Sequence, residues 1–351
     1  MYFRLLDETK AQAALITDPV NMRYISGFKG GEGAVYVSKD RRVVITDSRY
    51  TEAAAAESDF EVEEEGRDRK RHEIINDLLA ADGADTLAYE DRSMRCSELF
   101  DLQEKLPRVK NWIGLGEKAD ALRMIKTEEE IAKMEKAAGI ADRALEILLP
   151  MLKPGMTEKE GACELEYQMK KLGADGTSFD TIFASGVHSS MPHAVPSDKK
   201  LEYGDFVTID FGCTVDGYCS DMTRTVVIGR ADEKQKEIYS IVLKANETAL
   251  AGLKAGVRGC DIDAIARNII TDAGYGQCFG HGLGHSVGLY IHENPRLSKT
   301  DESVILENVI ETVEPGIYIP GWGGVRIEDM VVVTKDGFRL LCHSPKHLIE
   351  L

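Results

Sequence analysis

With 351 residues, the chain is too long for one ordinary hydrophobic core and fits two domains of about 100 to 200 residues each. Its composition, 43% hydrophobic and 29% charged, is that of a globular protein, and no stretch reaches the roughly 20 apolar residues of a membrane span. The formal net charge of −17 excludes a nucleic-acid-binding surface unless basic residues cluster sharply, and the one such cluster, Arg67 to Arg71, is expected to be a solvated helix face.

The N-terminus and the cysteines point to a cytosolic protein. The opening residues, MYFRLLDETKAQAALITDP, contain no basic segment followed by an apolar run, so we expect no export signal. Seven cysteines are scattered along the chain without CxxC spacing. This pattern favours reduced thiols, packed as small hydrophobic side chains, over disulfides or a thiolate zinc site.

The first 120 residues alternate between strand-like and helix-like sequence. The strand-like runs are AALIT, GAVYVS, RVVITD and DTLAYE. The helix-like runs are RYTEAAAAE, KRHEIINDLLAA and CSELFDLQEKL. Such alternation predicts an α/β domain built around a central sheet.

A new helix begins sharply at Thr127. Thr127 and Glu130 have the spacing of a capping box, and behind them apolar residues recur at steps of three and four until Pro150. The residues predicted to form this buried helix face are Ile131, Met134, Ala138, Ala141, Leu145 and Leu148. We therefore place the domain boundary near residue 123, which gives domains of residues 1–122 and 123–351.

A degenerate repeat runs through the second domain. Residues 145–173 and 247–274 both contain a helical segment, an LK-x-G turn, a second helical segment and a closing glycine. Each copy is followed by β-rich sequence. Two copies are too few for a solenoid, so we expect an α+β domain of two helix-plus-sheet halves, related by a pseudo-twofold repeat, that close around a cleft.

A hairpin predicted within residues 207–229 brings two acidic residues together. The Asp-Gly pair at 216–217 favours a two-residue turn, which places Asp210 opposite Thr223. Asp210 and Asp221 then share a face as diagonal neighbours about 7 to 8 Å apart, close enough to reach a common metal pair. A bulge would change this register, and Asp210 is alternatively a strand-end aspartate. A carboxylate that interrupts an apolar strand is costly without a partner, however.

Histidines gather on a glycine-rich segment, FGHGLGHSVGLYIHENPR, at residues 279–296. His281 and His285 lie among four glycines, and His292 follows. Neutral imidazole is the commonest metal ligand, and glycine lets a backbone approach closely. An ordinary loop explains one such histidine more easily than three of the eight in the chain.

The segment at residues 311–334 contributes two glutamates. Glu314 precedes a Pro-Gly turn, and Glu328 lies in a run that ends in valines. On one strand, Arg326, Glu328 and Met330 would point the same way. Facing a core, Arg326 and Glu328 need partners, and a cation would serve the glutamate. Alternatively, Arg326 and Glu328 form a surface pair.

Four carboxylates and one imidazole together form an oxygen-rich ligand set. Such a set is typical of a site for Mn, Co, Fe or Zn ions and differs from a structural zinc site, whose ligands are thiolates. Two metals about 3.5 to 4 Å apart can activate a shared water, so the set predicts hydrolysis. The proposed ligands are Asp210, Asp221, His285, Glu314 and Glu328.

The motifs that carry these residues resemble the pita-bread metallopeptidases, and within them the Xaa-Pro group that contains prolidase and aminopeptidase P. The first domain is similar to that of the family through NMRYISGF (21–28) and TDSRY (46–50). In the second domain the matching motifs are PHA (192–194), IDFG (209–212), SDMTRT (220–225), GHGLGH (280–285), HENPR (292–296), VEPGIYIP (313–320) and GGVRIED (323–329).

The resemblance implies a pita-bread catalytic domain that binds two divalent ions, with Mn as the first expectation and Co, Zn or Fe as alternatives. Asp210 and Asp221 would each bind metal, one of them bridging. His285 and Glu314 would complete the shell of one ion, and Glu328 would bridge to the other. Glu314 would also accept the proton of the attacking water, and a hydroxide bridging the ions would cleave the peptide.

The resemblance also implies how a peptide is held. Arg326 would bind carboxylate groups of the ligands or the substrate. Arg296 resembles the arginine that prolidases offer to the free carboxylate of a dipeptide, although it alternatively pairs with an acid such as Glu293. Contacts to the scissile carbonyl, or to the pocket for the next residue, would come from His193, His281 and His292.

The expected function is therefore that of a cytoplasmic Xaa-Pro dipeptidase or Xaa-Pro aminopeptidase, acting on short peptides with proline after the scissile bond. The family further implies a homodimer formed through the creatinase-like N-terminal domain, and no nucleic acid or membrane partner is expected. The alternatives are a creatinase-type amidinohydrolase and a non-catalytic binding protein of the same fold. The intact ligand set, and a sequence without charged tails, favour the peptidase.

Overall fold

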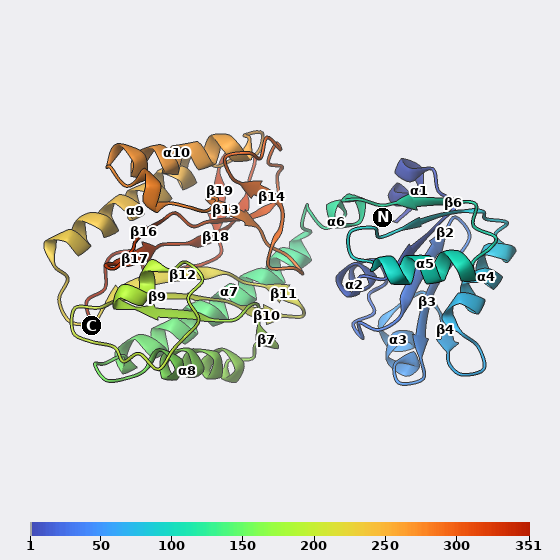
Figure 1. The fold of residues 1–351 in the computed structure, drawn as a ribbon, viewed down its shortest axis with the longest axis horizontal. Coiled ribbons are helices and arrows are strands. Elements are labelled where there is room, and N and C mark those ends of the chain that lie inside the picture. Colours follow the sequence, from blue (N-terminus) through green and yellow to red (C-terminus); the bar gives the residue numbers. More distant parts are fainter. Residues whose placement is uncertain (1) are drawn as a thin grey trace. The chain divides into compact units, whose positions relative to one another are not determined.

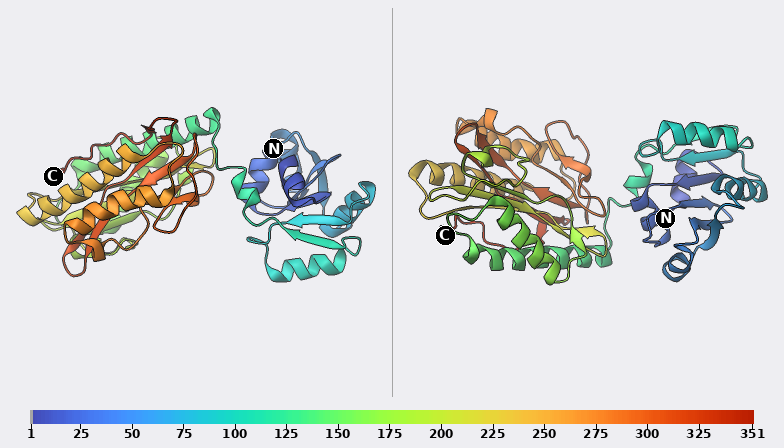
Figure 2. Two further views of the ribbon diagram at one scale, coloured as in Figure 1. Left: turned by 90° about the horizontal axis from the view of Figure 1, so that it is seen from above. Right: turned by 60° about the horizontal axis from the view of Figure 1, so that its bottom comes forward.

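The chain divides into two units, one ending at Arg123 and the other beginning at Met124. The computed structural model describes residues 2–351. Among these residues, no helix combines the length and the apolar character needed to cross a membrane. Figures 1 and 2 show the elements of both units, coloured along the sequence.

The first unit is built on one mixed sheet with the strand order β4-β3-β2-β1-β5-β6. Strand β2 pairs antiparallel with β1 and β3, and the other neighbours pair in parallel. The strands are β1 Ala13–Ile16, β2 Ala34–Ser38, β3 Arg42–Asp47, β4 Glu61–Glu65, β5 Thr86–Tyr89 and β6 Asn111–Gly114. The helices are α1 Phe3–Thr9, α2 Pro19–Ser26, α3 Thr51–Glu57, α4 Arg71–Ala81, α5 Cys96–Lys105 and α6 Lys118–Ala121.

Helices cover both faces of this sheet because its strands are apolar on both sides. In β1, Ala14 and Ile16 pack with residues of α1, α2 and α3, whereas Ala13 and Leu15 pack with residues of α4. The predicted α/β domain is therefore confirmed, together with the four strands and three helices expected in it. Helices α1, α2 and α6 and strands β4 and β6 were not predicted.

The basic cluster does not form the predicted helix face. Residues 67–70 precede α4, which begins at Arg71. Arg69 pairs with Glu63 at 2.5 Å and with Asp77 at 3.1 Å, and Arg71 pairs with Glu65 at 2.5 Å. Acidic neighbours therefore offset much of the positive charge of this cluster.

The second unit contains four long helices and several small sheets. The helices are α7 Glu128–Leu148, α8 Glu158–Lys171, α9 Glu233–Gly252 and α10 Gly259–Asp272, with 3-10 turns at Leu149–Met151, Gly186–Ser190 and Gly276–Cys278. The strands are β7 Gly176–Thr177, β8 Ile182–Ser185, β9 Phe206–Phe211, β10 Cys213–Val215, β11 Tyr218–Cys219, β12 Met222–Val227, β13 Gly284–Ser286, β14 Glu293–Leu297, β15 Ile310–Val313, β16 Gly316–Ile319, β17 Gly323–Arg326, β18 Asp329–Val333 and β19 Phe338–Leu340.

The sheets of the second unit lie between two helix pairs, α7 with α8 and α9 with α10 (Figure 1). Their strand orders are β11-β10-β7, β12-β9-β8, β14-β13-β15-β18-β19 and β16-β17. The turn inside each helix pair has its glycine in the left-handed region, Gly155 at φ 91° and Gly256 at φ 92°. Both copies of the predicted helix-turn-helix repeat are therefore present.

Helix α7 begins and ends where the sequence predicts. The Thr127 hydroxyl accepts from the Glu130 N–H at 3.3 Å, and the Glu130 carboxylate accepts from the Thr127 N–H at 2.7 Å, so the capping box is confirmed. The six apolar residues predicted on its buried face are all buried. The seven cysteines are free thiols, as expected, but only Cys213, Cys219 and Cys342 are buried.

Candidate active site

The hairpin that carries Asp210 and Asp221 has the predicted register. Its Asp-Gly turn at 216–217 has φ angles of 46° and 71°, as a type I′ turn requires. Asp210 in β9 pairs with Thr223 in β12. Because side chains alternate along a strand, this register places Asp210 and Asp221 on one face of the hairpin.

Three carboxylates converge at this face. One oxygen each of Asp210, Asp221 and Glu328 lies within 4.8 Å of the other two. Glu328 is fixed to the hairpin by Thr223, whose hydroxyl donates to the carboxylate at 2.7 Å and whose carbonyl accepts from the Glu328 N–H at 3.1 Å. Thr223 therefore joins the second glutamate segment to the aspartate hairpin.

Arg326 is buried against Asp210 rather than paired with Glu328 at the surface. Its side chain is 3% exposed and donates to Asp210 Oδ2 at 2.6 Å, to the Thr223 hydroxyl at 3.0 Å and to the Tyr318 hydroxyl at 2.7 Å. The predicted continuous strand through Arg326, Glu328 and Met330 is wrong. Strand β17 ends at Arg326, and β18 begins at Asp329.

His285 presents one ring nitrogen to two carboxylates. Its Nδ1 lies 3.1 Å from the carbonyl oxygen of Ser286, which identifies Nδ1 as the protonated nitrogen. Its Nε2 therefore carries the lone pair, 3.6 Å from Asp221 Oδ2 and 3.4 Å from Glu314 Oε1. Thr312 links the two residues, because its hydroxyl accepts from the His285 N–H and donates to Glu314 Oε1, each at 3.1 Å.

The site is short of positive charge. Burial, followed by the neighbouring carboxylates, raises the pKa of Asp221 and of Glu328 well above their usual values. Burial raises the pKa of Glu314 to about 8. Burial, with a contribution from His292, lowers the pKa of His285 to about 3, so this imidazole is neutral near pH 7. Arg326 supplies one positive charge among the acids.

A divalent cation fits this arrangement. Asp210 Oδ1 is buried and has no hydrogen-bond partner among residues 2–351, and such an atom is costly unless something binds it. The imidazole of His285 is in the tautomer that a metal needs, with Nδ1 fixed by a carbonyl. Closely packed carboxylates and a neutral imidazole are donors that divalent ions accept.

All ten residues predicted for the site line one cavity of about 610 Å³. Besides the five proposed ligands and Arg326, the cavity is lined by His193, His281, His292 and Arg296. Glu293, the alternative partner of Arg296, is buried and lies 3.1 Å from the Lys126 Nζ. Apolar residues complete the wall, among them Phe179, Ile182, Pro192, Val195 and Ile291.

Both ring nitrogens of His281 are bonded to protein atoms. Its Nδ1 lies 2.7 Å from the carbonyl oxygen of Gly282, and its Nε2 lies 3.0 Å from the Tyr318 hydroxyl. Burial and Arg326 lower the pKa of His281 to about 4. The Tyr318 hydroxyl accepts from Arg326 and so donates to His281. Sequence reasoning missed this role of Tyr318, and also Thr312, although both lie within or beside the VEPGIYIP motif.

Two family descriptions match the chain, one for each unit. Residues 132–335 match metallopeptidase family M24, and residues 4–125 match the creatinase/prolidase N-terminal domain.

Proteins of similar sequence and structure cover nearly the whole chain. A Xaa-Pro dipeptidase of Pyrococcus furiosus is 41% identical over 347 residues, which are 99% of this chain and 97% of that protein. The structure of a Xaa-Pro dipeptidase from Bacillus anthracis is 42% identical, with a TM-score of 0.95 over 99% of this chain and 98% of the other. The structure of an X-Pro aminopeptidase from Thermotoga maritima is 40% identical, with a TM-score of 0.93 over 99% of this chain and 100% of the other.

Proposed function

The chain belongs to metallopeptidase family M24, and on this premise we propose that it hydrolyses Xaa-Pro bonds in short peptides with the help of two divalent metal ions. The observation that carries the proposal is the convergence of four carboxylates and one neutral imidazole on a single cavity. Likeness to Xaa-Pro dipeptidases and to an X-Pro aminopeptidase over almost the full length supports the substrate.

Five residues would hold the two ions, with manganese expected first because oxygen donors predominate. When bound, the ions polarise the scissile carbonyl and make water a stronger nucleophile near neutral pH. Asp210 has a buried oxygen available for this purpose, and Arg326 orients the rest of its carboxylate. The proposed ligands are Asp210, Asp221, His285, Glu314 and Glu328.

Glu314 is the proposed acceptor of the proton from the attacking water. The Thr312 hydroxyl donates to Glu314 Oε1 at 3.1 Å and so orients the carboxylate. Burial raises the pKa of Glu314 to about 8 without metal, and bound cations would favour its ionised form, which can accept a proton. Glu314 is therefore suited to take the proton and later pass it to the leaving nitrogen.

His193, His292 and Arg296 would hold the peptide. His193 and His292 line the cavity and would contact the scissile carbonyl. His281 would shape the pocket instead, because both of its ring nitrogens already bond protein oxygens. Arg296 would bind the carboxylate of a dipeptide, because a guanidinium matches a carboxylate bidentately. Cleavage before proline needs a site that makes no demand for an amide hydrogen, since proline has none.

We further propose a homodimer, formed with the help of the first unit. The support is that the ten predicted site residues all lie in the second unit, which leaves the first unit without an evident catalytic set. Analytical ultracentrifugation should give about twice the chain mass of 38.8 kDa. A fully active monomer would rule the dimer out.

The function is tested with metal-stripped protein. We expect chelation to abolish cleavage of Xaa-Pro dipeptides and Mn²⁺, Co²⁺ or Zn²⁺ to restore it, with elemental analysis reporting up to two ions per chain. A matched series of Xaa-Ala peptides is the control for proline selectivity. Full activity in protein that contains no detectable metal would contradict the proposal, and so would equal cleavage of both peptide series.

A further inference from the structure

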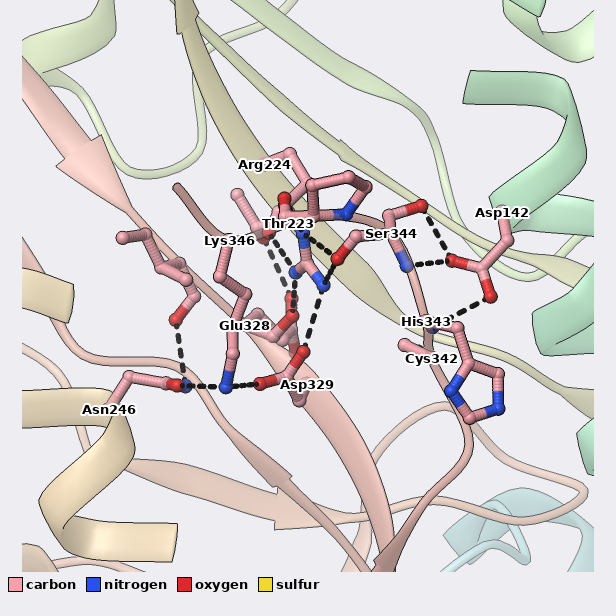
Figure 3. A network of polar contacts seen from close by, with 12 residues as sticks. Asp142, Thr223, Arg224, Asn246, Glu328, Asp329, Cys342, His343, Ser344 and Lys346 are labelled. Carbon is pink, nitrogen blue, oxygen red and sulfur yellow. Dashed lines mark hydrogen bonds and ion pairs between the residues drawn. The ribbon is translucent and has the colours of Figure 1, made fainter. Parts of the chain in front are cut away.

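Four polar side chains that do not line the cavity form a connected network, which Figure 3 shows. Asn246, Asp329 and Arg224 have exposed fractions of 0%, 1% and 2%, and the Lys346 side chain is 20% exposed. They come from α9, β18, β12 and the C-terminal segment. Burial of these groups is costly unless each one makes hydrogen bonds or ion pairs, so their contacts indicate which segments the four side chains hold in place.

Asn246 joins the backbone of the two glutamate segments. Its Nδ2 donates to the carbonyl oxygen of Val313 at 2.8 Å and to that of Ile327 at 3.4 Å. Val313 directly precedes Glu314, and Ile327 directly precedes Glu328. One amide therefore holds together the two peptide units from which the proposed glutamate ligands extend.

Lys346 determines which way this amide faces. The lysine ammonium can only donate, so the Asn246 Oδ1, 2.9 Å from Nζ, must face it, and the amide nitrogen must face the two carbonyls. The same Nζ lies 2.7 Å from Asp329 Oδ2. Figure 3 shows Asn246, Lys346 and Asp329 bonded in this order.

Arg224 extends the chain of contacts to the aspartate hairpin. Its Nη2 donates to Asp329 Oδ1 at 2.9 Å, and its Nη1 donates to the carbonyl oxygens of Thr223, at 2.9 Å, and of Glu328. Nη2 also donates to the Ser344 carbonyl at 2.8 Å. Three segments that carry proposed ligands are thus tied to one another and to the C-terminal segment.

We propose that Asn246, Lys346, Asp329 and Arg224 are positioning residues that set the separation of Glu314 and Glu328, and through it the affinity of the site for metal. The proposal rests on the proposed function, because it takes the two glutamates as ligands. Groups that orient metal ligands typically contribute 10 to 100-fold to metal affinity. Here the effect would act through the backbone, since the Asn246 Nδ2 donates to the carbonyl oxygens that directly precede the two glutamates.

The test measures metal affinity directly, by calorimetric titration of metal-free protein with Mn²⁺ well below its melting temperature. Asn246→Asp should bind about 10 to 100-fold more weakly, because a carboxylate cannot donate to the two carbonyls. Lys346→Met should also weaken Mn²⁺ binding. Lys346→Arg keeps a hydrogen-bond donor, so its affinity for Mn²⁺ should lie between those of Lys346→Met and the wild type. Arg41→Met is the control, since it removes a 2.9 Å ion pair with the 5% exposed Asp82 of the first unit.

Wild-type affinity in both Asn246→Asp and Lys346→Met would overturn the positioning role. An equal loss in Arg41→Met would also overturn it, because general destabilisation would then explain the effect. Lys346 is the most exposed of the four, so Lys346→Met carries the test if Asn246→Asp does not fold. If the wild-type protein bound none of Mn²⁺, Co²⁺ and Zn²⁺, the proposed function would instead be overturned, so the two failures are distinguishable.

Discussion

Replacing Arg326 by methionine should destabilise the metal-free protein strongly. The guanidinium is 3% exposed and makes hydrogen bonds of 2.6, 3.0 and 2.7 Å to Asp210, Thr223 and Tyr318. Removing one partner of a buried ion pair costs about 3 to 5 kcal/mol, because the other charge stays buried without compensation. For a domain of this size each kcal/mol corresponds to about 2 to 4 °C, so the melting temperature should fall by about 6 to 20 °C.

Bound metal should compensate for this loss of stability. In Arg326→Met the Asp210 charge is left among other acids, so a bound cation should stabilise the variant more than it stabilises the wild type. Differential scanning calorimetry with and without Mn²⁺ measures this difference. Arg326→Lys, which keeps the charge but not the planar fork, should be intermediate. A loss of stability below about 1 kcal/mol, or an equal loss with and without Mn²⁺, would contradict this role of Arg326.

Three further predictions concern the cavity. Arg296→Ala should lower kcat/KM for Xaa-Pro dipeptides by about 10 to 100-fold and leave Xaa-Pro tripeptides nearly unchanged, since a charge-assisted bond contributes about 1.5 to 3 kcal/mol. The exposed Lys299→Ala is its control, and equal effects on both substrates would place carboxylate recognition elsewhere. Because the pKa of Glu314 is raised to about 8 in the folded protein, metal-free protein should lose stability as pH rises from about 4.5 towards 8, and Glu314→Gln should flatten that dependence. A steeper pH profile in this variant would contradict the assignment. Gly284→Ala should abolish metal binding, because a Cβ atom there would lie 1.9 Å from the carbonyl oxygen of Thr312 and would displace β13, which carries His285. Calorimetric titration with Mn²⁺ tests this prediction, and wild-type affinity in the variant would contradict it.

The sequence by itself predicted those features that depend on residues close together in the chain. The Asp-Gly turn at 216–217 sets the pairing of Asp210 with Thr223, because a two-residue turn leaves only one register. The capping box at Thr127 sets the start of α7 for the same local reason. The residue types of the proposed ligands, and the motifs that contain them, likewise need no tertiary information.

The elements missed in the first unit are short or lie at the edge of the sheet. Strand β4 has the sequence EVEEE, which is too acidic to resemble a buried strand, and β6 has the sequence NWIG, whose asparagine and glycine are uncommon in strands. Both are the outermost strands of the sheet, where one side of the backbone needs no partner. Helix α2 did carry a local signal, since the Asp18 side chain caps it and Pro19 stands at its first position.

Only the tertiary structure decided which groups face one another across segments. The pairing of Arg326 with Asp210, the bridge of Thr312 between His285 and Glu314, and the contact of the Asn246 amide with two distant carbonyls each join residues from separate elements. No spacing along the chain encodes such contacts. They depend on how helices and sheets pack, because buried polar groups must find partners and only the folded chain brings those partners within bonding distance.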